Sequence, residues 1–523
     1  MDAEPSSHAQ WRRWVGLAVL ALPTVLLGLD VTVLYLVVPS LAADLQPSAT
    51  ETLWIMDAYG FLIAGFLLTM GTLGDRIGRR RLLMIGMVAF GAASVLAAFS
   101  PSAGWLIAAR ALLGVAGATL MPSTLSLISV LFTDARQRAL AIGVWATMFA
   151  LGMAAGPVVG GVLVSHFWWG AAFLIAVPVS VAVLVAAPAL LPEYRSDATR
   201  LDLRSVALSL TAMLPIVYAI KHVAAHGVDA QALAAVLLGG GSTVAFLRRQ
   251  WRLREPLLDI RLFSSPAFSV ALAVLLIGLV GFGGVMYLVT QYLQLVAGLS
   301  PLSAGLWMGP PALAMLIGGI GAPVIAGRYS PGIVMACTLA LSLIGYVLLA
   351  FAGTDSKVDV VVGFAFVYLG LGVIAALGTD IVVSAAPSER AGSAAALSET
   401  VQELGIAAGV ALLGSLTTAI YRAAVETPAG MPRSVAESYS DSLSGAVSVT
   451  DELPVAALDH AQDAFTSGLG TAAIAAGIAV AGAAIACFTM LRHIRPIGAA
   501  TPAAQTIAST CGSGQNRREG HGG

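Results

Sequence analysis

Apolar runs of about 20 residues follow one another along almost the whole chain, with short polar stretches between them. A helix needs about 20 mostly apolar residues to cross a bilayer, where its backbone polar groups must be bonded internally. The runs predict about fourteen transmembrane helices, at residues 14–38, 52–72, 82–100, 104–129, 139–164, 169–191, 204–221, 230–247, 267–296, 301–326, 332–352, 359–384, 394–419 and 467–490. The chain is therefore predicted to be an all-α integral membrane protein.

The composition supports this class. Only 11% of the residues are charged, against roughly 25% in a soluble domain, which leaves too little charge to cover a water-exposed surface. The net charge is −1, so no strongly basic surface indicates a nucleic-acid partner. Cys337, Cys487 and Cys511 are scattered and form neither a disulfide framework nor a metal-binding spacing. We expect no metal.

The distribution of arginine predicts the orientation in the membrane. If residues 1–13 are cytoplasmic and the helices alternate, most arginines fall in cytoplasmic loops, as the positive-inside rule requires. The outer loops then contain only four basic residues, Lys221, Lys357, Arg422 and Arg433. Both termini are thus predicted to lie in the cytoplasm, with 491–523 as a disordered tail rich in Gly, Ser, Ala and Thr. The polar, acidic stretch 421–466 becomes an extracytoplasmic loop, either with short helices or as a flexible connector.

A faint internal repeat divides the chain. Arg76 and Arg328 are separated by the same number of residues as Arg138 and Arg390. Parallel halves around a site near the middle of the membrane are a transporter architecture. The repeat predicts two six-helix bundles, at 14–191 and 267–490, with two extra helices at 204–247 between them.

A glycine- and charge-rich segment joins the second and third predicted helices. It reads Gly71-Thr-Leu-Gly-Asp75-Arg76-Ile-Gly78-Arg79. Glycine permits a tight turn, and a carboxylate such as Asp75 is favoured at a helix N-terminus, where it can also pair with an arginine. We expect a charge latch that favours the state closed to the cytoplasm. The alternative is that these arginines only mark the cytoplasmic side.

Three charged residues fall inside apolar runs. Arg110 lies well within the fourth predicted helix, and Asp30 lies in the middle of the first. Ionisable groups at such depth are costly and indicate a functional site that binds a cation or a proton. Arg110 alternatively extends its side chain to the outer surface. Asp57, near the outer end of the second helix, is either an interfacial acid or part of the same site.

Glu399 and Glu403 are four residues apart, which on a helix puts them on one face, one turn from each other. Two carboxylates this close in a low dielectric are costly to charge together, so one is expected to hold a proton. A cation that arrives between them would expel that proton, which is an exchange mechanism. The alternative is that the helix starts later and both side chains face the cytosol.

Small residues line the fifth predicted helix in Gly152-Met-Ala-Ala-Gly156-Pro157-Val-Val-Gly160-Gly161. Glycines spaced by four clear one helix face for close packing. Pro157 removes a backbone donor and bends the helix. By itself this pattern indicates a packing seam.

Between Trp14 and Arg492 these motifs together resemble the major facilitator superfamily, and most closely its 14-helix drug:proton antiporter-2 family, which includes quaternary-ammonium, dye and fluoroquinolone pumps. Local matches include Leu53-Trp54-Ile55 and Ser398-Glu399. The resemblance implies a major facilitator fold, a monomer, and no cofactor because a proton gradient supplies the energy. It implies cation or proton sites at Asp30, Asp57, Glu399 and Glu403, proton coupling at Arg110, and an antiporter motif, typical of exporters, at Gly152–Gly161. Some relatives carry a further acid in helix 10, and 301–326 contains none, so handling of divalent cations is not expected.

We therefore expect a proton-coupled antiporter that exports lipophilic, mostly cationic drugs, dyes or antibiotics across a bacterial cytoplasmic membrane. A dedicated exporter of one antibiotic and a lipid flippase are the alternatives. The segment GxxxxGK[ST], which would bind a nucleotide, is absent from the sequence, and no catalytic cluster stands out. An enzyme is not expected.

Overall fold

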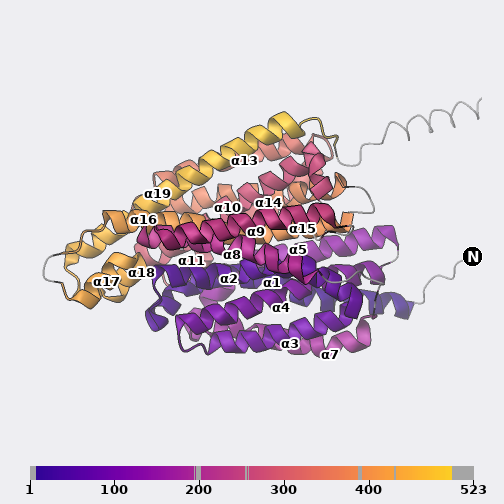
Figure 1. The fold of residues 1–523 in the computed structure, drawn as a ribbon, viewed down its shortest axis with the longest axis horizontal. Coiled ribbons are helices and arrows are strands. Elements are labelled where there is room, and N and C mark those ends of the chain that lie inside the picture. Colours follow the sequence, from indigo (N-terminus) through magenta and orange to yellow (C-terminus); the bar gives the residue numbers. More distant parts are fainter. Residues whose placement is uncertain are drawn as a thin grey trace, which may run out of the picture.

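The computed structural model describes residues 7–132, 134–193, 195, 202–253, 256, 258, 260–386, 391–428 and 431–496. Within these ranges every regular element is a helix (Figure 1). Thirteen helices of this part are long and apolar enough to cross a bilayer. The helix α2 (Ala49–Ile77), bent by 55° between Leu67 and Thr69, is the fourteenth. The predicted all-α membrane fold with about fourteen spans is confirmed.

The N-terminal half contains six spans. Its helices are α1 (Ser7–Leu45), α2 (Ala49–Ile77), α3 (Arg79–Ala98), α4 (Ala103–Leu131), α5 (Ala135–His166), α6 (Ala171–Leu174) and α7 (Ala176–Leu190). The helices α6 and α7 are two pieces of the span predicted at 169–191, interrupted at Ile175. Pro178 explains the break, because it has no amide hydrogen to donate to the carbonyl of Leu174.

The C-terminal half repeats this pattern. Its spans are α10 (Pro266–Gln291) with η2 (Tyr292–Val296), α11 (Pro301–Trp307) with α12 (Gly309–Ala326), α13 (Pro331–Ala350), α14 (Lys357–Ser384), α15 (Ala391–Gly409) with η4 (Val410–Gly414) and α16 (Ser415–Ala424), and α19 (Val455–Ala486) with η6 (Cys487–Leu491). The elements η2, η4 and η6 are single π turns, which occur frequently at functional sites.

Corresponding helices pack in the same order in the two halves. In the first half α1 packs against α5, α2 against α4, and α3 against α7. In the second, α10 packs against α15, α12 against α14, and α13 against α19. Two six-helix bundles with two helices between them are therefore present, as predicted. The inserted helices are α8 (Leu203–His226) and α9 (Ala230–Arg252), and a short helix η1 (Ile260–Ser264) precedes α10.

The inserted helix α8 touches both halves. It packs against α9, against α2 of the N-terminal half, and against η4 and α16 of the C-terminal half. An apolar cluster joins these elements and includes Phe61 of α2, Val217 of α8, and Ala407 and Ala411 of the C-terminal half. A movement between the halves must therefore change the surroundings of α8.

The two ends of the bundle differ (Figure 1). At one end, named the cap end, lie α17 (Arg433–Asp441) and α18 (Leu443–Ser448), followed by η5 (Thr450–Glu452). At the other end, named the termini end, lie the start of α1 and the end of η6.

The predicted boundaries of the C-terminal region need correction. The loop predicted at 421–466 is shorter, because α16 continues to Ala424 and α19 already begins at Val455. The first turns of α19 are polar, and Gln462 there donates a hydrogen bond to the carbonyl of Leu295; hydropathy alone therefore placed the helix start too late. The segment contains short helices and is not a flexible connector over its described length. Leu491 is buried within η6, and residues 497–523 of the predicted tail lie outside the described residues.

A buried charge network between the two halves

Arg110 and Asp30 form a buried ion pair in the N-terminal half. The Nη1 atom of Arg110, on α4, lies 2.8 Å from Oδ2 of Asp30, on α1, and the two side chains are 2% and 8% exposed. Arg110 also donates to the carbonyl of Ile55 at 3.1 Å, and its guanidinium lies 4.5 Å from the centre of the Tyr59 ring. The alternative in which Arg110 reaches the outer surface is wrong, since the side chain points into the bundle.

Close helix contacts bring these groups together. A Cβ atom at Gly114 of α4 would lie 2.5 Å from the carbonyl oxygen of Tyr59 on α2. Only a glycine permits this approach, because any side chain at that place would push α4 away from α2. The local sequence around Arg110 therefore sets the depth at which its guanidinium meets α1 and α2.

A second buried ion pair connects α2 with the inserted helix α8. The Nζ atom of Lys221 lies 3.1 Å from Oδ1 of Asp57, and the side chains are 1% and 0% exposed. The same Nζ lies 3.8 Å from the centre of the Trp54 ring. Asp57 is thus not an interfacial acid. Lys221, expected in an outer loop, lies inside α8, because that helix continues past the predicted end of its span to His226.

Glu399 and Glu403 lie one turn apart on α15, which begins at Ala391. Glu403 is 5% exposed and Glu399 is half-buried. The helix starts well before Glu399, so the alternative with both side chains in the cytosol is wrong. Within the described chain, neither carboxylate has a hydrogen bond or an ion pair with another side chain.

Glu403 approaches the first ion pair from the other half of the protein. The carboxylates of Glu403 and Asp30 are close enough to repel each other when both are ionised. Both also lie close enough to Tyr59 to interact with it electrostatically. The Tyr59 hydroxyl is buried and has no hydrogen-bond partner among the described residues, so it is available to either acid. The structure thus brings Asp30, Arg110 and Glu403 together, whereas Asp57 forms a separate pair with Lys221.

The glycines of α5 pack this helix against α1. A Cβ atom at Gly152, Gly156 or Gly160 would collide with backbone or side-chain atoms of α1. At Gly156 the neighbour is Thr32, whose hydroxyl donates to the carbonyl of Met153 at 2.9 Å. This face of α5 fixes the position of Asp30 two residues before Thr32.

The remaining residues of the α5 motif form a seam between the halves. A Cβ atom at Gly161 would lie 2.5 Å from the carbonyl oxygen of Pro301 on α11, and one at Gly305 would lie 2.5 Å from that of Pro157. The two helices therefore contact each other through backbone atoms near the cap end. The motif predicted as a packing seam has two packing faces, one within its half and one across the halves.

The predicted latch segment lies within the N-terminal half. Arg79 donates to Asp75 at 2.8 Å and to the carbonyl of Pro122 on α4 at 3.3 Å. Gly78, at φ 111°, makes the turn between α2 and α3, and a Cβ atom there would collide with Glu193.

The other two latch residues also remain in this half. Arg76 is exposed, and a Cβ atom at Gly71 would lie 3.9 Å from Pro122. All described hydrogen bonds of the latch segment stay within the N-terminal half, so the latch does not close the termini end in this conformation.

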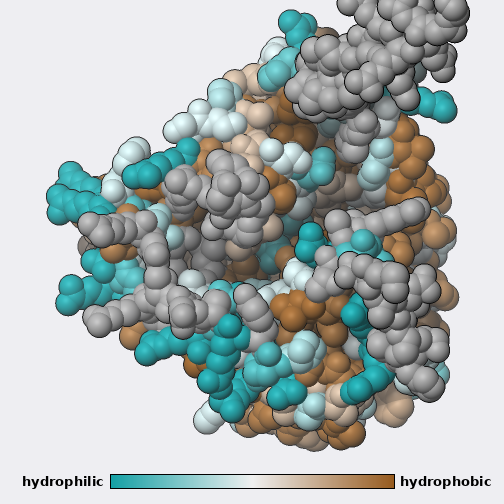
Figure 2. All heavy atoms as spheres, turned by 90° about the vertical axis from the view of Figure 1, so that its right-hand side faces the viewer, coloured by the Kyte–Doolittle hydropathy of each residue, from teal (hydrophilic) through white to brown (hydrophobic). Residues whose placement is uncertain are grey.

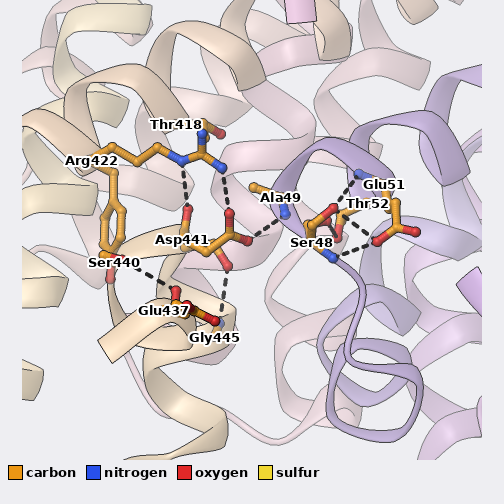
Figure 3. Close-up of polar contacts among 12 residues, drawn as sticks. Ser48, Ala49, Glu51, Thr52, Thr418, Arg422, Glu437, Ser440, Asp441 and Gly445 are labelled. Carbon is orange, nitrogen blue, oxygen red and sulfur yellow. Dashed lines mark hydrogen bonds and ion pairs between the residues drawn. The ribbon is translucent and has the colours of Figure 1, made fainter. Parts of the chain in front are cut away.

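At the cap end, hydrogen bonds join the two halves (Figure 3). The backbone amide of Ala49, at the start of α2, donates to Oδ2 of Asp441 at 2.7 Å. Arg422 of α16 binds the other oxygen of the same carboxylate. Gln294 of η2 donates to the carbonyl of Leu36 on α1 at 3.1 Å. The cap end is therefore closed by contacts between the halves.

The termini end looks different. Figure 2 shows this face, on which hydrophilic side chains gather around a hollow. Glu399 lies on the termini side of Glu403, because α15 starts at that end. The carboxylates of α15 are thus arranged along a line from the termini end toward the Asp30–Arg110 pair.

Sequence reasoning missed Lys221 as a member of the network. A weak signal was present, since lysine occurs at only two positions of the chain. Trp54 enters the sequence analysis only through the match Leu53-Trp54-Ile55, and no local pattern relates it to this lysine. In the described part of the chain, no group of three or more His, Cys, Asp or Glu side chains could hold a metal ion.

In the described part of the chain, two repeated six-helix bundles with two helices between them, together with buried charges inside the membrane-spanning region, define a polytopic membrane transporter. Residues 20–410 match the Major Facilitator Superfamily. The chain belongs to this superfamily, whose members are transporters and not enzymes, and it is a multi-pass bacterial membrane protein.

Relatives match nearly the whole chain. The multidrug efflux pump LfrA of Mycolicibacterium smegmatis is 45% identical over 93% of this chain and 98% of its own length. The methyl viologen resistance protein SmvA of Salmonella typhimurium is 34% identical, with 87% and 93% covered. The tetracenomycin C resistance and export protein of Streptomyces glaucescens is 31% identical, with 98% and 97% covered.

A solved structure shares the fold. It is a bacterial homologue of the human lysosomal transporter Spinster, in an inward-facing and unoccupied conformation. The TM-score is 0.62 at 16% identity, with 94% of this chain and 99% of that chain covered. At this identity the likeness concerns the fold alone.

Proposed function

We propose that the protein is a proton-coupled antiporter that exports lipophilic, mostly cationic compounds from the cytoplasm. The observation that carries this proposal is Glu403, a buried carboxylate that has no partner side chain among the described residues, opposite the Asp30–Arg110 pair of the other half. An unpaired buried carboxylate is costly when ionised. It is therefore stable either with a proton or with a bound cation, which is the requirement for exchange.

The exchange follows from electrostatics. Arg110 already neutralises Asp30, so the net charge of the site depends on Glu403 and Glu399. A cation that enters from the termini end favours the ionised carboxylates and releases their protons. Protons that return from the other side neutralise the carboxylates and weaken the hold on the cation. A ligand shifts the conformational equilibrium only through such a difference in affinity.

Alternating access requires the cap end to open. The backbone contacts between α5 and α11, together with the Ala49–Asp441 hydrogen bond, have to separate in that state. The Asp75–Arg79 latch segment is free to contact the C-terminal half once the termini end closes. The binding energy of the latch would then offset the loss of the contacts at the cap end.

The direction of transport rests on orientation. The termini end carries most of the arginine residues, including Arg76 in the last turn of α2 and Arg80 and Arg81 in the first turn of α3. Basic residues are retained on the cytoplasmic side, so we assign the termini end, with both termini, to the cytoplasm. The conformation with a closed cap end is then the one that receives a compound from the cytoplasm.

A dedicated exporter of one antibiotic is the second candidate. The similarity to the tetracenomycin C exporter covers 98% of the chain, and such a protein would use the same ion pairs and seams. The two candidates differ only in the range of compounds accepted.

Ethidium efflux driven by an imposed pH gradient tests the proposal. Wild type in inverted vesicles is compared with Glu403→Gln, Glu399→Gln and Asp30→Asn, with ethidium binding by the purified variants measured in parallel. We expect gradient-driven transport by wild type and its loss in Glu403→Gln. Wild type that binds ethidium but transports it without regard to the gradient would exclude proton coupling. If wild type neither binds nor transports any of several cationic dyes, the dedicated exporter becomes the better description.

A further inference from the structure

Trp54 and Asp57 lie one turn apart on α2, and their side chains together have the chemistry of a site for an organic cation. The face of an indole ring and a carboxylate converge on one point, and the Nζ atom of Lys221 occupies that point, 3.8 Å from the ring centre and 3.1 Å from Oδ1. An aromatic face beside a carboxylate is an arrangement that binds alkyl- and arylammonium ligands. The lysine ammonium thus stands where the charged part of such a ligand would lie.

We propose that Trp54 and Asp57 form a subsite for a monovalent organic cation, which Lys221 fills as a tethered ammonium when no ligand is bound. The inference rests on the proposed export of cationic compounds and adds the mechanism of their release. A ligand enters this subsite only by displacing Lys221, and the return of Lys221 expels the ligand.

The Lys221–Asp57 pair differs in its hydrogen bonding from a permanent structural ion pair. Lys221 has three donors, yet Oδ2 of Asp57 is buried and has no hydrogen-bond partner in the part of the chain that the structure describes. Arginine, with its planar fork, is the side chain suited to a fixed buried pair, and the protein uses it at Arg110. Lysine is a compact charge on a flexible stem, which suits a group that leaves and returns. Lysine is rare in this chain, and Lys357 is the only other one. A lysine at this buried position is therefore unusual for the sequence.

The location of Lys221 links its position to the transport cycle. It lies near the end of α8, which ends at His226. This helix contacts α2, η4 and α16, so it belongs to neither half alone. When the halves move relative to each other, α8 cannot keep both sets of contacts, and a movement that takes it away from α2 separates Lys221 from Asp57. The internal cation therefore competes with the ligand to a degree that depends on conformation.

Binding of tetraphenylphosphonium to the purified full-length protein tests the inference. If Lys221 fills the subsite about 90% of the time, its removal raises the apparent affinity about tenfold, because affinity scales with the competent fraction. We expect this gain in Lys221→Met and its absence in Asp57→Asn/Lys221→Met, which lacks both charges. Lys357→Met is the matched control, because Lys357 lies 4.9 Å from the ring centre of Trp307 outside the site, and we expect it to bind as wild type does.

Lys221→Arg provides a second variant that keeps the charge balance and hence the fold. A guanidinium holds Asp57 through two donors, so we expect weaker tetraphenylphosphonium binding than in wild type. Unchanged or weaker binding by a folded Lys221→Met, or wild-type binding by Lys221→Arg, would overturn the inference. The ethidium efflux of wild type under a pH gradient is a separate readout. If wild type shows no ethidium efflux, the proposed function is wrong. The affinity differences among the Lys221 variants test the subsite alone.

Discussion

Asp441 of α17 accepts a hydrogen bond from the backbone amide of Ala49 at 2.7 Å, across the boundary between the two halves. The acceptor is a carboxylate at the first turn of α2, where the helix dipole favours negative charge. Arg422 orients this carboxylate from the C-terminal half (Figure 3). The short helices at the cap end therefore reach from one half to the start of a helix in the other.

Replacement of Asp441 by Ala is expected to favour opening of the cap end. A hydrogen bond to a charged group contributes about 1.5–3 kcal/mol, so the open state should become at least about tenfold more populated. The measurement is the rate at which maleimide labels Thr52→Cys, a buried position near this contact, in a background without native cysteines. The control is Arg433→Ala, whose exposed pair with Glu437 lies in α17 alone. Equal labelling rates in Asp441→Ala and the control would show that this contact does not hold the cap end closed.

Substitution of Gly161 by Val should prevent closure of the seam between α5 and α11. The added side chain would occupy the position of the Pro301 carbonyl, 2.5 Å from the Cβ atom. Overpacking of this kind costs about 1–3 kcal/mol, so we expect a cap end that remains open and dye efflux reduced about tenfold or more. Gly143→Val on the same helix is the control, because a Cβ atom there has no neighbour within 4 Å. If both variants transport equally, the seam has no role in access.

Removal of the Arg110 charge should destabilise the protein more than removal of the whole pair. Loss of one member of a buried ion pair typically costs about 3–5 kcal/mol, because the other charge is left uncompensated. We expect a lower thermal unfolding temperature in Arg110→Met, and partial recovery in Asp30→Asn/Arg110→Met. Transport should be absent from both. Recovery of stability without recovery of transport would separate the structural contribution of the pair from its function. Equal unfolding temperatures of the two variants would show that Arg110 and Asp30 do not stabilise each other as an ion pair.

The hairpin of α8 and α9 should lose stability in acid. Hydrogen bonds from Arg249 hold the pKa of Asp202, the residue before α8, at about 2. A lowered pKa stabilises the folded state above the unfolded value of about 3.9, and this stabilisation is lost as the pH falls through the folded pKa. Between pH 5 and 8 the contribution should be constant.

Hydrogen exchange at the start of α8 measures this effect. We expect faster exchange in Asp202→Asn than in wild type at pH 7, by a stability difference of about 1–2 kcal/mol. The difference should shrink when wild type is compared at pH 3, where protonation of Asp202 begins. A difference that is independent of pH would mean that the helix cap, and not the charge, stabilises this hairpin.

Much of the fold was predictable because the bilayer restricts it. Each span must be apolar, of nearly fixed length and internally hydrogen-bonded. The local sequence is therefore enough to predict where the spans lie. Pro178 and the polar start of α19 show where this fails: a missing backbone donor splits one span, and polar residues extend another beyond its apolar part. Hydropathy detects the membrane, but it does not detect how far a helix continues outside it.

The sequence by itself determined the class of protein, the two halves, and the costly residues Asp30, Arg110, Glu399 and Glu403, because their placement in apolar runs needs a functional reason. Only the tertiary structure decided which of these residues meet. Asp57 and Lys221 are separated by 164 residues, and no periodicity relates a carboxylate on α2 to an amine on an inserted helix. Their pairing depends on how α8 packs against both halves, a property of the assembled bundle and of no single segment.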